Sequence, residues 1–277
     1  MKEFLHNYGI EFFALVPLSS CKVIKPYLLE KNNLDNSCNV ITMLIPYRSK
    51  STPTNISVYA SVKDYHLFVA ELSKSLEGYM KEKFPLCKFK VFSDHSPIDE
   101  VHATCISGLG FIGDNGLLIN EKYSSFVFLA EAITDLTPED LKIDCSVQEK
   151  IRECLHCGKC ASSCPSGCIK RADEESLLPK SFCLSAITQK KGELTKEDIS
   201  LMIENNTVWG CDICQNVCPF TVNASYTPIE FFKRDIITSL DRATLEGLSE
   251  DEFKSRPFAW RGRAVIERNI KLFEEHK

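Results

Sequence analysis

The sequence has no long apolar run and no excess of positive charge. No segment approaches the roughly 18 apolar residues of a membrane-spanning helix, and the first residues lack the small-residue cleavage site of a signal peptide. The 33 Lys and Arg residues are outnumbered by 38 Asp and Glu residues, and a net charge of −5 gives no overall basic field for nucleic acid. With 12 Gly and 12 Pro residues, there is no low-complexity linker and no solenoid repeat. We therefore expect a globular, cytoplasmic protein without membrane contact.

Cysteine, by contrast, is abundant. The chain of 277 residues contains 14 cysteines, which concentrate between Cys154 and Cys218. Because thiols stay reduced in the cytoplasm, this density favours metal or cluster ligation over disulfides. The isolated cysteines nearer the N-terminus follow no motif, and we expect them to be buried core thiols: Cys21, Cys38, Cys87, Cys105 and Cys145.

The length predicts about two domains, and the residue pattern predicts an α+β chain in three parts. These parts are an N-terminal α/β domain at residues 1–145, which the family resemblance given below implies to be of cobalamin-binding type, a ferredoxin-like two-cluster domain at 146–222 and a helical C-terminal extension at 223–277. Apolar runs suited to buried strands occur at residues 11–18, 40–46, 88–92 and 126–133. Helical patterns occur at residues 58–83, at 97–107 with Pro97 in the first turn, and around 228–234 and 262–275.

The first cysteine run has the spacing C-x2-C-x2-C-x3-C-P of bacterial ferredoxins. It consists of Cys154, Cys157, Cys160 and Cys164, followed by Pro165. Three thiolates two residues apart can wrap one 4Fe–4S cubane, and the three-residue step turns the fourth thiolate toward a second cubane. Proline lacks an amide donor and helps to end the turn.

The second run repeats this motif without its first cysteine, whose position is held by Val208. It consists of Cys211, Cys214 and Cys218, followed by Pro219. A two-cluster module needs eight thiolates, the two runs supply seven, and Cys183 between them is the best candidate for the eighth.

The crossing pattern of ferredoxins predicts two 4Fe–4S clusters. Cluster one takes Cys154, Cys157, Cys160 and Cys218, and cluster two takes Cys164, Cys183, Cys211 and Cys214. The alternative is structural zinc, which prefers closed tetrahedral sites made of paired C-x2-C knuckles. The C-P endings argue against zinc. Cys168 fits neither run, and we expect it to be a small buried hydrophobic residue.

Two such clusters could serve an electron carrier or feed a catalytic site. A carrier needs well under a hundred residues, whereas about 145 residues precede this module. The extra length favours a second cofactor or a substrate pocket.

Several motifs outside the cysteine runs resemble the epoxyqueuosine reductase family. The resemblance covers roughly residues 40–270. It is carried by Tyr59, Asp64-Tyr65-His66, Ser93-Asp94 with Pro97, Gly108 to Gly113 with Asn115, Ser125 to Leu129, Gly210-Cys211-Asp212 with Cys214-Gln215, and Trp260-Arg261-Gly262. The chain departs from the family pattern at Val62, Val101 and Asp114. It resembles a short form without the C-terminal helical repeats of many members.

This resemblance implies a cobalamin-dependent oxidoreductase that reduces epoxyqueuosine in tRNA to queuosine, with electrons passing from the clusters to cobalt. The family is similar to the corrinoid reductive dehalogenases. The resemblance assigns the proton-donating acid to Asp94. It assigns cofactor contacts to Asp64, Tyr65, His66, Gly108, Gly110, Gly113 and Asn115.

The residues themselves leave alternatives open. Asp94 follows a predicted strand, where α/β domains place ligand-facing groups, but Asp94 or Ser96 could simply cap the next helix. The three glycines could form a simple turn, and Asp64, Tyr65 and His66 could be one core aromatic residue with two solvated neighbours.

The expected partners are an electron donor of ferredoxin or flavodoxin type and tRNA. The basic stretch that could contact phosphate, or be only a solvated helix face, comprises Arg256, Arg261, Arg263, Arg268 and Lys271. The alternative function is a ferredoxin-like electron carrier, or a corrinoid-linked reductase of a small molecule, without tRNA.

Overall fold

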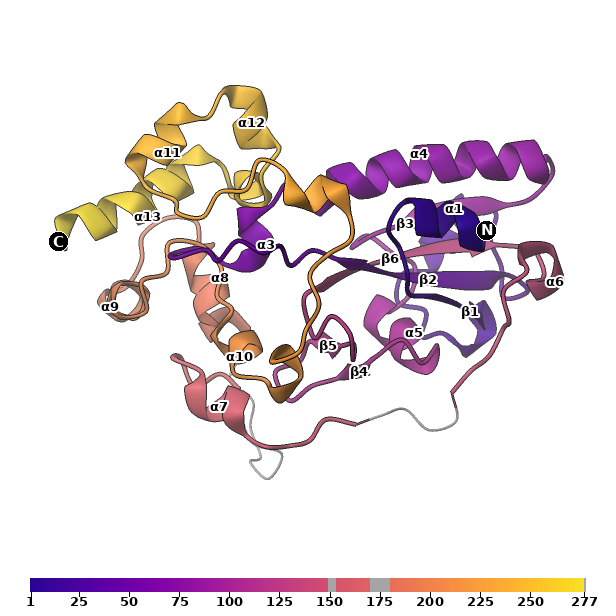
Figure 1. The fold of residues 1–277 in the computed structure, drawn as a ribbon, viewed down its shortest axis with the longest axis horizontal. Coiled ribbons are helices and arrows are strands. Elements are labelled where there is room, and N and C mark those ends of the chain that lie inside the picture. Colours follow the sequence, from indigo (N-terminus) through magenta and orange to yellow (C-terminus); the bar gives the residue numbers. More distant parts are fainter. Residues whose placement is uncertain (149–152, 170–179, 277) are drawn as a thin grey trace. The chain divides into compact units, whose positions relative to one another are not determined.

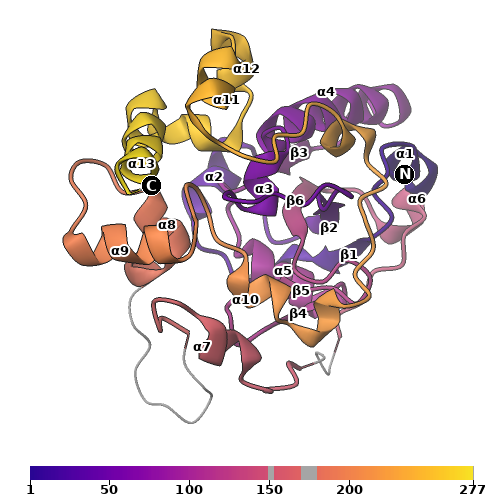
Figure 2. The ribbon, with the colours of Figure 1, turned by 60° about the vertical axis from the view of Figure 1, so that its left-hand side comes forward.

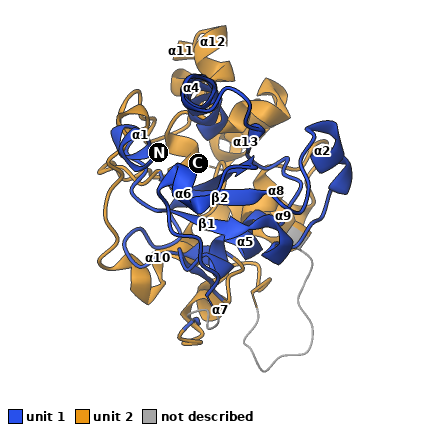
Figure 3. Cartoon of the chain, turned by 90° about the vertical axis from the view of Figure 1, so that its right-hand side faces the viewer, with its two compact units in different colours: residues 1–46, 65–113, 117–154 blue, residues 47–64, 114–116, 155–277 orange. Residues whose placement is uncertain are grey.

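A computed structural model describes residues 1–148, 153–169 and 180–276 (Figure 1). The chain divides into two compact units, each built from separate segments (Figure 3). The first unit contains Met1–Pro46, Tyr65–Gly113 and Leu117–Cys154, and the second contains Tyr47–Asp64, Asp114–Gly116 and Leu155–Lys277. Each unit therefore draws on chain segments far apart in the sequence. The three consecutive domains expected from the sequence stay a prediction.

The first unit is built on a four-stranded sheet in the order β1-β2-β6-β3. Its strands are β1 (Phe13–Pro17), β2 (Asn39–Pro46), β6 (Val127–Thr134) and β3 (Phe89–Phe92). These strands match the four predicted apolar runs to within about two residues. Every pairing is antiparallel, with Leu44 opposite Leu129 and Val91 opposite Ala132. The parallel-sheet rule used to place Asp94 therefore does not apply, although the mixed α and β composition is confirmed.

Helices cover both faces of this sheet. Helix α4 (Tyr65–Lys83) packs on β3, and α5 (Glu100–Ile106) packs against β2 and β6 from the other side (Figures 1 and 2). Leu72 and Leu76 of α4 are fully buried, which accounts for the helical periodicity of this segment. The unit is completed by α1 (Lys2–Asn7), η1 (Leu18–Ser20), α2 (Pro26–Lys31), α6 (Pro138–Leu141) and the hairpin of β4 (Phe111–Ile112) and β5 (Leu118–Ile119).

Two predicted helices differ from those observed. The pattern at residues 58–83 contains two helices, α3 (Val58–Ser61) and α4, because Val62 is extended with φ −96° and ψ 174°. The helix expected at 97–107 begins only at Glu100, since Asp99 is its N-cap and accepts a hydrogen bond from the His102 amide. Pro97 therefore lies before the helix rather than in its first turn, and neither Asp94 nor Ser96 is its cap.

The second unit has no named strand in its described part and consists of short helices around a core that includes Trp209, Phe258 and Ile266. The predicted segment at 228–234 is a 3-10 helix, and the one at 262–275 is α13 (Arg263–Glu275) with Gly262 as N-cap. The other helices are α7 (Lys159–Ser163), η2 (Lys180–Phe182), α8 (Leu184–Thr188), α9 (Lys196–Glu204), α10 (Ile213–Asn216), η3 (Pro219–Thr221), η4 (Glu230–Lys233), α11 (Arg242–Gly247), α12 (Glu250–Lys254) and η5 (Pro257–Arg261).

Among the described residues, none of the helices combines the length and the apolar character needed to cross a membrane.

Of the isolated cysteines, Cys38 and Cys105 are buried as expected. Cys21, Cys87 and Cys145 are only half-buried, so the expectation of core burial is wrong for these three.

Gly210 is the glycine whose replacement should cost most stability. Its φ is +72°, and a Cβ atom there would lie 2.0 Å from the Ser57 hydroxyl oxygen. We expect Gly210→Ala to lower the free energy of unfolding by about 2–4 kcal/mol. The alanine would be strained in the left-handed conformation, and its Cβ would collide with the Ser57 side chain. Denaturant unfolding under anaerobic conditions measures the change.

Gly247 provides the matched control. It has no atom within 4 Å of a built Cβ and no positive φ, so Gly247→Ala should change stability by less than about 1 kcal/mol. Equal losses in the two variants would contradict the assigned role of Gly210.

Candidate functional site

The four cysteines predicted for cluster two come together in the second unit. Cys164 follows α7, Cys183 is the N-cap of α8, and the Cys211 and Cys214 thiols lie at α10. Burial, with the nearby Cys183 and Cys164 thiols adding to it, raises the pKa of Cys211 to about 12. Burial, with Cys211 and Cys183 adding to it, raises the pKa of Cys214 to about 12. Four converging thiols are the donor set that a 4Fe–4S cluster requires.

Cys168 belongs to the same group of sulfurs. Its Sγ lies 3.6 Å from the Sγ of Cys164, and the side chain is half-buried. The expectation of an isolated buried hydrophobic residue was therefore wrong, because the turn at Gly167 brings this thiol back beside Cys164. Burial alone would raise the pKa of Cys164, but hydrogen bonds from the Ser166 hydroxyl and the Ile169 backbone hold it below its usual value. That environment favours the thiolate, the form that binds metal.

Two of the four cysteines predicted for cluster one, Cys160 and Cys218, lie at helices α7 and α10. These helices pack together, with Cys160 inside α7 and Cys218 directly after Val217, the C-cap of α10. The end of the second cysteine run therefore lies beside the first run, as the crossing pattern requires. Cys157 is exposed, and Cys154 is the last residue of the first unit. The assignment of these four ligands stays a prediction.

The segment that carries Cys211 is held in place by buried polar contacts. The Asp212 carboxylate accepts hydrogen bonds from the Val58 amide at 2.5 Å and from the Gln215 side chain at 2.8 Å. The Trp209 indole donates to the Tyr59 hydroxyl at 3.0 Å. Burial raises the pKa of Asp212 to about 6. Asn115 hydrogen-bonds the Cys214 thiol in the second unit and lowers its pKa, and the cofactor contact expected of Asn115 stays a prediction.

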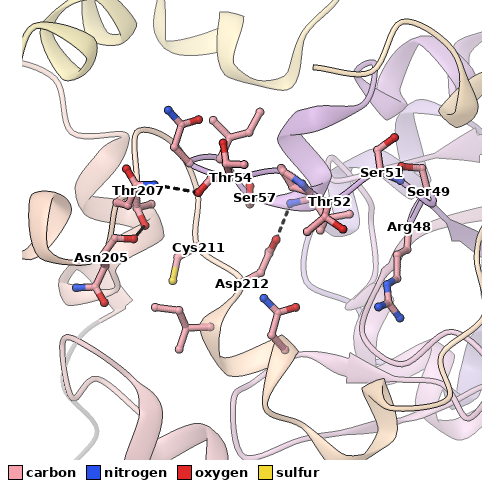
Figure 4. Close-up of a pocket in the computed structure, with 18 of the residues that line it drawn as sticks. Arg48, Ser49, Ser51, Thr52, Thr54, Ser57, Asn205, Thr207, Cys211 and Asp212 are labelled. Carbon is pink, nitrogen blue, oxygen red and sulfur yellow. Dashed lines mark hydrogen bonds between the residues drawn. The ribbon is translucent and has the colours of Figure 1, made fainter. Parts of the chain in front are cut away.

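A polar pocket lies beside Cys211 within the second unit (Figure 4). Its volume is about 220 Å³, and side-chain hydroxyl and amide groups make up most of its lining. Arg48 at its edge donates to the backbone carbonyls of Thr221 and Ala224 and lies over the Tyr226 ring. The residues labelled in Figure 4 are Arg48, Ser49, Ser51, Thr52, Thr54, Ser57, Asn205, Thr207, Cys211 and Asp212.

In the first unit, the structure brings Asp94, His66 and Tyr65 together. The His66 Nε2 atom lies 3.1 Å from the Asp94 Oδ2 atom, and the two side chains are 51% and 68% exposed. The Tyr65 ring stacks on Phe128 of β6 at 4.2 Å. This group offers a stacked ring, an imidazole and an accessible carboxyl group, which suits a planar macrocycle with polar side groups. Asp64 belongs to the second unit, where its amide donates to the Ser255 carbonyl.

The space beside two of the predicted glycines is taken by the chain itself. A Cβ at Gly108 would lie 2.9 Å from the Gln148 side chain, and one at Gly110 would lie 2.7 Å from the Ile119 carbonyl oxygen. Gly113 closes the β4–β5 hairpin by donating its amide to Leu117. These contacts favour the turn alternative for Gly108 and Gly110, and cofactor contact at all three glycines stays a prediction.

Sequence reasoning missed two carboxyl groups next to Asp94. The Glu100 Oε1 atom accepts the Asp94 amide at 3.1 Å, and Glu131 of β6 is 1% exposed. A single acidic residue inside the apolar run at 126–133 was the available signal for Glu131, because an unpaired charge is costly in a buried strand.

The basic stretch does not form one exposed patch. Arg256 is 4% exposed, and Arg268 donates to the carbonyls of Lys190 and Gly192. Arg261 stacks on Trp260, and Arg263 donates to the Leu245 carbonyl. Lys271 pairs with Glu275. Arg256 is thus corrected from a surface contact to a core residue.

The comparison with known families identifies the cysteine region. The family described as a 4Fe-4S double cluster binding domain matches residues 153–221. This range contains both cysteine runs and Cys183, so the region is an iron–sulfur redox module with two cubane sites.

Curated relatives then place the whole chain. It is 30% identical over 285 residues to an epoxyqueuosine reductase of Lactococcus garvieae, with coverage of 97% of this chain and 75% of that protein. It is 32% identical over 195 residues to one of Cyclobacterium marinum, with coverage of 69% and 54%. The chain belongs to the epoxyqueuosine reductase family. It spans about half to three quarters of the length of these relatives.

Two solved structures have a fold similar to that of this chain. One, described as an epoxyqueuosine reductase with an epoxyqueuosine-modified tRNA-Tyr stem loop, has a TM-score of 0.74 and 25% identity, covering 99% of this chain and 80% of that one. An epoxyqueuosine reductase from Streptococcus thermophilus has a TM-score of 0.75 and 22% identity.

Cys183 and Cys168 give a paired test of the ligand assignment. We expect Cys183→Ala to lose the iron of cluster two, because it removes one of four ligands. Cys168→Ala should keep its iron, because Cys168 belongs to neither run. Iron and sulfide analysis of anaerobically purified protein measures both. Full iron in Cys183→Ala, or a loss only in Cys168→Ala, would contradict the assignment.

Proposed function

We propose that this chain is a cobalamin-dependent reductase that converts epoxyqueuosine in tRNA to queuosine. The observation that carries the proposal is that one chain of this family combines a 4Fe-4S double cluster binding domain with an accessible Asp94–His66 pair. The module accounts for electron supply, and the carboxyl group accounts for proton supply. Both are needed to reduce an epoxide.

The cysteines have the first role in this proposal. Cys154, Cys157, Cys160 and Cys218 would hold one cluster, and Cys164, Cys183, Cys211 and Cys214 the other. A soluble donor of ferredoxin or flavodoxin type would reduce them. The partly exposed ligands of cluster one, above all Cys157, give such a donor an accessible entry point.

Asp94 would protonate the oxygen that leaves as the epoxide opens. Its side chain is exposed rather than packed in the core, so a substrate can reach it. His66 contacts the same carboxyl group at 3.1 Å and can orient it or return its proton. Tyr65, stacked on Phe128, forms an aromatic wall beside the pair.

Tyr65, His66 and Asp94 are also the residues that would face cobalamin, and Gly113 with Asn115 are further predicted contacts. When bound, the cofactor supplies a strongly reducing cobalt centre. The residues of this chain would orient the substrate beside it, exclude water and hold the proton on the Asp94 carboxyl group.

The tRNA part of the proposal rests on the family and on the stem-loop complex of a structural neighbour. Among the predicted contacts, Lys271 is exposed and Arg261 is half-buried, so these two are the best placed to meet phosphate. Since most of the basic stretch is engaged internally, a corrinoid-linked reductase of a small molecule, or an electron carrier, is the alternative. A corrinoid spectrum that survives desalting after anaerobic reconstitution supports the reductase, whereas clusters alone support the carrier.

Asp94→Asn tests the assigned acid. We expect it to keep its iron and its corrinoid but to lose about 10²- to 10⁴-fold in the rate of queuosine formation, because Asn cannot donate a proton of carboxylic acidity. The measurement is single-turnover conversion of epoxyqueuosine-containing tRNA.

Asp99→Asn is the matched control, because Asn is an equally good N-cap for α5 in the same loop. Full activity in Asp94→Asn, or equal losses in the two variants, would remove Asp94 from the mechanism.

A further inference from the structure

Asp94 sits on an unusual piece of backbone. Its φ is +56°, in the left-handed region that residues other than glycine adopt only at some cost. Aspartate tolerates this region better than most residues. Even so, the conformation needs support from neighbouring groups, and the described contacts identify that support.

The support comes from Glu100 in the first turn of α5. Its Oε1 atom accepts the backbone amide of Asp94 at 3.1 Å, so the α5 side chain ties down the turn that presents the Asp94 carboxyl group. The same turn is contacted from α4, where His66 Nε2 lies 3.1 Å from Asp94 Oδ2. Glu100 therefore fixes the backbone, while His66 contacts the side chain.

Behind Glu100 lies a second carboxyl group on the central strand β6. Glu131 is 1% exposed, and neither of its oxygens has a hydrogen bond of full geometry in the described chain. The side chains that act on its protonation are the Glu100 carboxyl group, the buried Ser96 hydroxyl group and the Asp94 carboxyl group. Glu131 is buried and Glu100 is half-buried, and two neighbouring carboxyl groups in such surroundings cannot both be charged without a large penalty.

Few opposite charges offset this pair. A hydrogen bond from Glu131 favours the charged form of Glu100, the Asp94 carboxyl group adds negative charge near it, and Lys25 before α2 is the cation that acts on it. Lys25 itself contacts His95, the residue after Asp94, at 3.4 Å. Around Glu131, the titratable groups besides Glu100 are the Asp94 carboxyl group and the Cys21 thiol. Burial, followed by Glu100, holds the pKa of Glu131 well above its usual range.

We propose that Glu131 and Glu100 share one proton and act as a latch that holds the Asp94 turn in its left-handed conformation. With the proton present, Glu131 donates to Glu100 and leaves the Glu100 Oε1 atom to accept the Asp94 amide. When the proton is lost to solvent, the negative charges on the buried Glu131 and the half-buried Glu100 repel each other, Glu100 moves outward and the turn is released.

The latch deepens the proposed function, because it makes Glu131 and Glu100 positioning residues for the proposed acid. It predicts that the Asp94 turn loosens as the pH rises, independently of the ionisation of Asp94. Glu131→Gln keeps a donor at the same place that cannot lose its proton, so this variant should abolish the pH dependence.

The first test measures hydrogen exchange of the Asp94 amide in the full chain with its clusters, as a function of pH. After correction for intrinsic exchange, we expect the protection of the wild-type amide to fall as the pH rises and that of Glu131→Gln to stay constant. Glu100→Ala should lower protection about tenfold or more at every pH, because it removes a hydrogen bond to a charged or shared carboxyl group. Asp99→Asn, in the same loop, should behave like the wild type.

The second test uses linkage. A carboxyl group whose folded pKa is raised stabilises the fold most below its unfolded pKa, about 4.3 for Glu, and that contribution is lost as the pH rises through the folded value. The melting temperature of Glu131→Gln should therefore fall less than that of the wild type between pH 5 and the alkaline range. Should Glu131→Gln fail to fold, infrared spectra of the wild type with ¹³C-labelled Glu must still show a protonated carboxyl band at neutral pH.

Equal pH dependence of exchange and melting in the wild type and Glu131→Gln would overturn the latch. So would an infrared spectrum with only ionised glutamates at neutral pH. None of these measurements needs cobalamin or tRNA. Failure of the reductase assignment would therefore appear only in the turnover experiments, and failure of the latch only here.

Discussion

The cysteine site depends most on a buried contact between residues 57–59 and residues 209–212. The Asp212 carboxylate accepts the Val58 amide, Trp209 donates to Tyr59, and Gly210 leaves room for Ser57. This contact joins a segment that precedes α4 to the turn that presents Cys211. Thiolates can share a cluster only when their backbones are held at the right separation. The buried contact therefore fixes the backbone position of Cys211 relative to the other cysteines predicted for cluster two. The motif Gly210-Cys211-Asp212, which carries part of the family resemblance, thus contains a structural anchor as well as a predicted ligand.

Local patterns in the sequence predicted much of the fold. The four apolar runs became the four strands of the sheet, since each is buried on at least one face. The antiparallel order could not be read from these runs, because pairing is decided by contacts between distant segments such as β2 and β6. The break at Val62 was missed for a related reason. An apolar residue continues the helical periodicity even where the backbone turns extended.

The site was predictable to the extent that spacing encodes it. The cysteine spacing predicted that the two cysteine runs, which lie at α7 and α10, come together. It also pointed to Cys183 as the candidate for the eighth thiolate. It could not show that Cys168 folds back to within 3.6 Å of Cys164, because that depends on a left-handed glycine between them. Likewise, Asp94 was predicted from the family resemblance. The single acidic residue in the apolar run at 126–133 was a signal for Glu131, but the position of Glu131 next to Glu100 depends on contacts between distant segments, which the run does not encode.

The interleaving of the two units has a consequence for how the polypeptide matures on the ribosome. Strands β1 and β2 are synthesised early, but β2 lies between β1 and β6, and β6 is synthesised about eighty residues later. The intervening segment at residues 47–64 belongs to a unit whose largest part, Leu155–Lys277, emerges after β6. Neither unit can therefore be obtained from one uninterrupted stretch of the gene, and both must wait for distant segments before their cores can close.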